Sequence, residues 1–201
     1  MRKTKIFIIK SANRDKDKKF KLTEMSALQA EKWANNIFLG LIKTGTVEIP
    51  DEVKGAGMAA LAVVGLRALN SINFFDAEPL LDEILSCAQF IPKGEEPRGI
   101  LEDDIEEVET LTSLKTQIFN LHTEFFTSRR NIDLPNVGGG KSGGELSNYF
   151  NIPQTIGVVV SSKLVTLHEL DTIYGVEDLY DLLEILIINA HNEQVMKDNN
   201  Q

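Results

Sequence analysis

Apolar residues recur along most of this chain at the three- to four-residue spacing of amphipathic helices, and a strand pattern occurs only near the N-terminus. Residues 6–9 and 20–22 are rich in Ile, Phe and Leu, and they flank a polar turn at residues 13–17. This arrangement predicts a β-hairpin. Because an isolated two-stranded hairpin is marginally stable, we expect it to pack against helices.

The first helix has clear start and stop signals. Ser26 with Gln29 three residues later predicts a capping box, and Thr44-Gly45 predicts the end of the helix. A rotation of about 100° per residue gathers a core face. Its members are Ala30, Trp33, Ala34, Ile37, Phe38 and Leu41. On the opposite side the pattern leaves Leu28 and Leu39 exposed.

Three further helices are expected before residue 128. The first begins at Pro50 and runs to about Asn70, and because it is apolar on every side it should be buried. Asp76 is expected to cap the next one, which continues to about Pro92. After a loop rich in Pro and Gly, the last of the three covers about residues 103–126.

A glycine-rich run at residues 135–144 separates these elements from a second group of helices. Such a run is typical of a flexible linker, because glycine loses the most backbone entropy on ordering. Beyond it, Pro153 starts a short helix, Thr166 and Glu169 form a capping box, and a last helix begins near Glu177. On that helix Ile188 lies on the polar face and Ile185 at its edge. Fewer than 50 residues rarely fold alone, so this group is expected to dock on a partner.

These patterns predict a mostly α fold. An N-terminal β-hairpin packs on a helical bundle, followed by the glycine-rich linker and a small all-helical module. The expected boundaries are 1–128 for the first domain, 129–149 for the linker and 150–201 for the second module.

Composition narrows the functional classes. The net charge of −9 and the pI of about 4.9 argue against nonspecific binding to nucleic acid or to an anionic membrane. Cys87 is the single cysteine, so no internal disulfide is possible. The most apolar segment, residues 55–66, is too short to span a bilayer, and no secretory signal is visible. We therefore expect a cytosolic protein. The basic stretch at residues 1–21 could contact an acidic surface, including one on the same chain. A solvated hairpin is the preferred interpretation, because the basic residues alternate with strand residues and crowd the turn.

No pattern of catalytic residues stands out. Gly140-Lys141-Ser142 matches the second half of a phosphate-binding loop, but Pro135 occupies the position of its first glycine and no buried strand precedes it. The acidic residues 102–107 suit the first turn of a helix better than a cation site. His122, His168 and His191 are far apart in sequence. We therefore predict no enzyme activity, no cofactor and no metal site.

Several stretches resemble the tail assembly chaperones of tailed phages and prophages. In the first domain they are Phe20-Lys21-Leu22-Thr23-Glu24-Met25, Gln29-Ala30-Glu31-Lys32-Trp33-Ala34, Val47-Glu48-Ile49-Pro50-Asp51, Asp76-Ala77-Glu78-Pro79-Leu80-Leu81-Asp82-Glu83, Ile100-Leu101-Glu102-Asp103-Asp104-Ile105-Glu106-Glu107 and Leu121-His122-Thr123. In the second module they are Leu164-Val165-Thr166-Leu167-His168-Glu169-Leu170-Asp171-Thr172 and Glu177-Asp178-Leu179-Tyr180-Asp181-Leu182-Leu183-Glu184. The second module is similar to the segment fused onto such chaperones in lambda-like systems.

The resemblance implies a non-enzymatic protein of the host bacterial cytoplasm that is absent from the mature virion. Its partners would be the tape measure protein, which it keeps soluble, and the tail tube protein, which it recruits; self-association into a homo-oligomer stays open. Candidate contact residues are Leu28, Leu39, Ile185 and Ile188. In lambda-like systems the long form arises by a ribosomal frameshift, and Gly140-Lys141 matches the residues that a slippery site encodes. The main alternative is a structural virion component, such as a tail-completion or connector protein.

Overall fold

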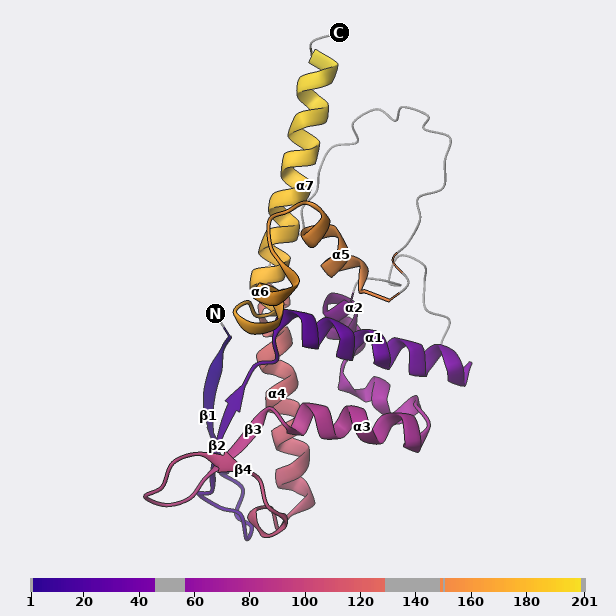
Figure 1. Cartoon of the computed structure of the whole chain (residues 1–201). Helices are drawn as coiled ribbons and strands as arrows, with labels where there is room; N and C mark the ends of the chain where they lie inside the picture. Colours follow the sequence, from indigo (N-terminus) through magenta and orange to yellow (C-terminus); the bar gives the residue numbers. More distant parts are fainter. Residues whose placement is uncertain (1, 46–56, 129–148, 150, 200–201) are drawn as a thin grey trace.

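The computed structural model describes residues 2–45, 57–128, 149 and 151–199, and it is mostly α-helical with a small antiparallel sheet (Figure 1). The predicted fold class is therefore confirmed. The glycine-rich run, the Gly140-Lys141 pair and the predicted helix start at Pro50 all lie outside the described residues. The linker and the two domain boundaries beside it stay predictions.

The sheet contains more strands than the sequence pattern indicated. The predicted hairpin is confirmed as β1 (Thr4–Ile8) and β2 (Lys19–Thr23). Two further strands, β3 (Ala88–Ile91) and β4 (Arg98–Gly99), extend it in the order β1-β2-β3-β4. Phe90 pairs with the fully buried Phe20, and the two ring centroids are 5.5 Å apart. This pairing is long-range, so the local pattern around residue 90 did not reveal it.

The first helix agrees closely with its prediction. Helix α1 (Ala27–Thr44) is capped by the Ser26 hydroxyl, which accepts the backbone N–H of Gln29, and it ends at Gly45 with φ of 66°. This is one half of the predicted capping box; the Gln29 side chain instead donates to Glu83 at 3.1 Å. Every residue of the predicted core face is buried. A left-handed φ at a helix end is the conformation that glycine adopts without strain. The start, the end and the buried face were thus all readable from local chemistry.

The long apolar helix expected to reach Asn70 is wrong as one element. The structure has α2 (Gly57–Val64) and a 3₁₀ helix, η1 (Leu66–Ser71), separated by Gly65 at φ of 79°. The helix is also not buried on every side, because Val63 is 88% exposed. Composition alone did not show that the face of α2 that carries Val63 would be left exposed by the elements that the structure describes.

Helix α3 (Phe74–Leu85) begins and ends earlier than predicted. Its cap is Asn73, whose side chain accepts the N–H of Phe75, while Asp76 lies in the first turn. The helix ends at Leu85 rather than near Pro92, because the residues that follow enter β3. Asn73 precedes the first apolar residue by one position, and it is as good a cap as Asp76.

The predicted fourth helix is split into a 3₁₀ helix, η2 (Glu102–Asp104), and α4 (Val108–Ser128). The break coincides with a contact between the basic hairpin turn and the acidic stretch. Asp15 accepts the backbone N–H groups of Glu106 and Glu107, and Lys18 bridges Asp15 at 2.7 Å and Glu106 at 2.9 Å. Burial opposes the charge on Asp15, but the Lys18 ammonium and these backbone donors lower its pKa to about 2. The preferred interpretation of the basic stretch, a solvated hairpin, is therefore wrong for this turn, which contacts an acidic surface of the same chain.

The second module consists of α5 (Gln154–Ser161), α6 (Leu167–Thr172) and α7 (Val176–Asn199). The predicted capping box of Thr166 and Glu169 is present. The expected docking is intramolecular: α5, α6 and the start of α7 lie against α1 (Figure 1). Val176 belongs to the large core cluster of the first domain, and Ala27 belongs to the cluster of the second module.

Candidate functional site

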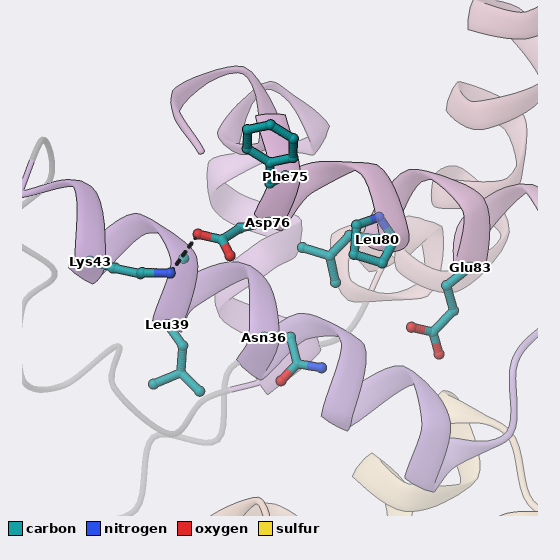
Figure 2. A pocket seen from close by; sticks show the side chains of 9 residues that line it. Asn36, Leu39, Lys43, Phe75, Asp76, Leu80 and Glu83 are labelled. Carbon is teal, nitrogen blue, oxygen red and sulfur yellow. Dashed lines mark hydrogen bonds and ion pairs between the residues drawn. The ribbon is translucent and has the colours of Figure 1, made fainter. Parts of the chain in front are cut away.

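An open groove of about 380 Å³ runs between α1 and α3 (Figure 2). Helix α1 contributes one wall and the N-terminal turns of α3 contribute the other. The lining residues are Asn36, Leu39, Gly40, Lys43, Phe75, Asp76, Pro79, Leu80 and Glu83. Two of the large apolar side chains, Leu39 and Phe75, are 62% and 80% exposed.

Two polar contacts join the walls of the groove, whereas its apolar residues Leu39 and Phe75 are exposed to solvent. The indole N–H of Trp33 donates to the backbone carbonyl of Leu80 at 3.0 Å and so ties α1 to α3. Lys43 bridges Asp76 at 2.8 Å across the groove. A groove whose two walls are held together and whose apolar residues are exposed suits the apolar face of another helix.

A second cluster of functional interest lies between the two modules and is centred on Glu31 of α1. This carboxylate is fully buried and joins four helices. It accepts the Met58 N–H at 3.1 Å, the Thr155 hydroxyl at 2.8 Å and the Tyr180 hydroxyl at 3.1 Å. Burial raises the pKa of Glu31 to about 7, although these three donors oppose the shift.

Two further polar contacts cross the same junction. Glu24, 1% exposed, accepts the N–H of Val176 at 3.2 Å, and its pKa is raised because burial outweighs its hydrogen bonds. The N–H of Ala27, the first residue of α1, donates to the carbonyl of Tyr174 at 2.9 Å. The second module thus satisfies an amide that a helix start would otherwise leave to water. We call Glu24, Glu31, Thr155, Val176 and Tyr180 the carboxylate seam.

The carboxylate seam also explains why residue 57 is a glycine. Gly57 has φ of 50°, and a Cβ there would overlap the Glu31 carboxylate. We expect Gly57→Ala to lower the free energy of unfolding by about 3 kcal/mol, because backbone strain adds to the displacement of Glu31. Gly45→Ala is the matched control: its φ is 66° in the left-handed helical region but nothing lies within 4 Å of a Cβ, so only the strain of about 1 kcal/mol remains. Urea denaturation measures both; equal losses would contradict the overlap.

The four predicted contact residues lie in three different places. Leu39 lines the groove. Leu28 is half-buried against the hydrophobic cluster of the second module, so the exposure expected for it is wrong. Ile185 and Ile188 are on α7, 47% and 36% exposed. Phe75 was not among the residues predicted from the sequence, although the pair Phe74-Phe75 next to the acidic residues of a helix start was a usable signal.

The remaining candidate chemical groups are structural. His122 is buried; its Nε2 accepts the N–H of Met25 at 2.7 Å, its Nδ1 lies 2.8 Å from the carbonyl oxygen of Ile118, and burial lowers its pKa to about 4. Burial raises the pKa of the Cys87 thiol to about 12, so the thiolate nucleophile is not available at neutral pH. Among the described residues, no three His, Cys, Asp or Glu side chains gather as metal ligands would.

The described part of the chain has no helix with the length and apolar character that a membrane crossing requires. Comparison with known proteins adds no assignment: no family model, no curated protein and no solved structure matches this chain. The class that fold and site define is a mostly α protein with an open apolar groove and a buried polar seam between two modules.

Proposed function

We propose that this chain is a non-enzymatic tail assembly chaperone of a tailed phage or prophage, acting in the host bacterial cytoplasm. Its client is the tape measure protein, whose helices it keeps soluble, and it recruits tail tube subunits. The sequence resemblance motivates this assignment. The observation that carries it is the α1–α3 groove, where Leu39 and Phe75 are exposed on two walls that polar contacts join.

The charge distribution supports a holding function. A chaperone for an apolar helical client needs exposed apolar side chains together with enough charge to remain in solution. The groove supplies the exposed apolar side chains, with Leu39 on one wall and Phe75 on the other. The net charge of −9 supplies the second. Because α3 carries only acidic charges, the groove favours a client helix whose apolar stripe has basic flanks.

Leu39→Asp tests this site. We expect it to weaken binding of the tape measure protein from the same genome about tenfold, because a charge would enter an apolar contact. Co-expression followed by co-purification measures the loss, and circular dichroism checks that the chain remains folded. Ile42→Asp is the matched control, since Ile42 is 48% exposed on the same helix but does not line the groove. Equal binding by both variants and the original chain would remove the groove from the proposal.

The alternative function, a structural virion component, predicts a different location at the end of assembly. Mass spectrometry of purified particles separates the two. A chaperone is present in the infected or induced cell and absent from mature particles, whereas a tail-completion or connector protein remains in them. Detection of the chain at a fixed stoichiometry in virions would overturn the proposed function.

A further inference from the structure

The C-terminal half of α7 extends away from the rest of the molecule (Figure 1). The first half packs through Leu179, Leu182, Leu183 and Leu186. From Ile187 onward every described residue is exposed except the half-buried His191. About 13 residues, or ~20 Å of helix, therefore project without a covering element within the described chain.

This projecting segment carries a second apolar stripe, separate from the packed face. Its exposed apolar members are Ile185, Ile188, Val195 and Met196. At about 100° per residue they and Asn192 fall within an arc of roughly 100°, on a side of the helix different from the packed leucines. We call these five residues the α7 stripe. The positions 185, 188, 192 and 195 follow the alternating three- and four-residue steps of a coiled-coil seam.

The central residue of the α7 stripe, Asn192, is polar but uncharged. This limits the kind of helix that can pack on the stripe. Asn192 is exposed, and its side-chain amide both donates and accepts hydrogen bonds. A purely apolar helix would bury that amide without a partner, which is unfavourable. A second copy of the same helix, parallel and in register, brings Asn192 opposite Asn192 and satisfies both amides. No like charges would meet within the stripe, because it contains no Asp, Glu, Lys or Arg.

We propose that two copies of the chain associate through the α7 stripe as a short parallel coiled coil. Ile185 and Asn192 occupy the a positions, and Ile188 and Val195 occupy the d positions. Ile at both a and d positions by itself favours three or four strands, and Asn192 counters this by specifying register and two-strandedness at a cost in stability. The seam is limited to about two heptads because Asp181, one heptad before Ile188, would bring like charges together. The dimer is therefore weak and dissociates on dilution.

Sedimentation equilibrium of the full chain over a wide concentration range tests the proposal. We expect a monomer–dimer equilibrium whose dissociation constant rises at least tenfold in Ile188→Asp. Ile187→Asp is the matched control, because Ile187 is as exposed as Ile185, 47% each, but lies outside the stripe; it should dimerise like the original chain. A chain that is monomeric at all concentrations, or a dimer unaffected by Ile188→Asp, overturns the proposal.

A second measurement tests orientation. In a Cys87→Ser background, Ile185→Cys should form an intermolecular disulfide under mild oxidation, because an a position at the end of the stripe faces its own copy only in a parallel, in-register pair. Gln194→Cys, on another side of α7, should not. Equal cross-linking at both positions overturns the register. If the chain is monomeric and Ile188→Asp instead loses the tape measure protein, the stripe is a client site, and the proposed function survives without the dimer.

Discussion

Replacing Glu31 by alanine should lower the free energy of unfolding by about 4 kcal/mol at pH 6, the largest loss expected from any single substitution in the seam. The Met58 N–H and the Thr155 hydroxyl lose the acceptor they have in the structure, and Tyr180 loses one of its contacts. The removed side chain also leaves a void at a position that is fully buried. Urea denaturation followed by far-UV circular dichroism measures the loss.

Two controls distinguish the seam from a general effect of removing a carboxylate. Glu31→Gln retains the shape and an acceptor oxygen, so it should cost only about 1 kcal/mol at the same pH. Glu169→Ala removes the exposed carboxylate of the capping box in α6, where water can replace the lost acceptor, so the expected loss is much smaller than that of Glu31→Ala. If Glu31→Ala cost no more than Glu169→Ala, the junction would not depend on the buried carboxylate.

The second large effect concerns pH. The pKa of Glu31 is about 7 in the folded chain, and 4.5 is its ordinary value. Between pH 4.5 and pH 7 the Glu31 carboxyl is therefore protonated in the folded state and ionised in the unfolded state. The stability that this proton contributes is complete below pH 4.5 and is lost as pH rises through 7, a total of about 3 kcal/mol. The contribution of Glu31 to the free energy of unfolding should therefore decrease as the pH rises.

The pH effect of Glu31 must be measured as a difference between the original chain and a variant, because other buried groups also change the pH dependence of stability. Glu24, whose pKa is also raised, acts in the same direction as Glu31. His122 acts oppositely: its pKa is lowered to about 4 from 6.5, so its contribution is present above pH 6.5 and lost as pH falls through 4. Subtracting the pH profile of Glu31→Gln from that of the original chain cancels both. We expect the stability advantage of the original chain to shrink by about 2.5 kcal/mol between pH 5 and pH 8. A flat difference would mean that Glu31 is charged throughout.

Local chemistry predicted much of the helical part. Ser26 and Gly45 mark the ends of α1 because capping acts within one turn, and the Thr166–Glu169 box behaves in the same way. Strands β3 and β4 were missed because their partners are distant in the chain: Phe90 pairs with Phe20. The break at Gly65 was missed because a helical pattern continues through it, and only its left-handed φ reveals the turn.

The candidate site was predicted only in part. Leu39 was found because its exposure follows from helical periodicity alone. Glu31 is buried because α5 and α7 cover it, and no local sequence pattern shows that these distant helices pack there. One signal was available: Ala27 and Ala34, four positions before Glu31 and three after it, are small, and both are fully buried. A glutamate between two small residues on one helix face leaves room for another helix to approach.

The hydrogen bond between Glu24 and Val176 joins residues 152 positions apart. Synthesis at ~5–20 residues per second places about 8–30 s between the emergence of these two residues from the ribosome. Until the second module is made, Glu24 and Glu31 have only their partners in the first domain, the N–H groups of Lys3 and Met58, and they lack the donors of Thr155, Val176 and Tyr180. The order of translation therefore leaves the nascent first domain with two carboxylates whose pairing only the finished protein completes.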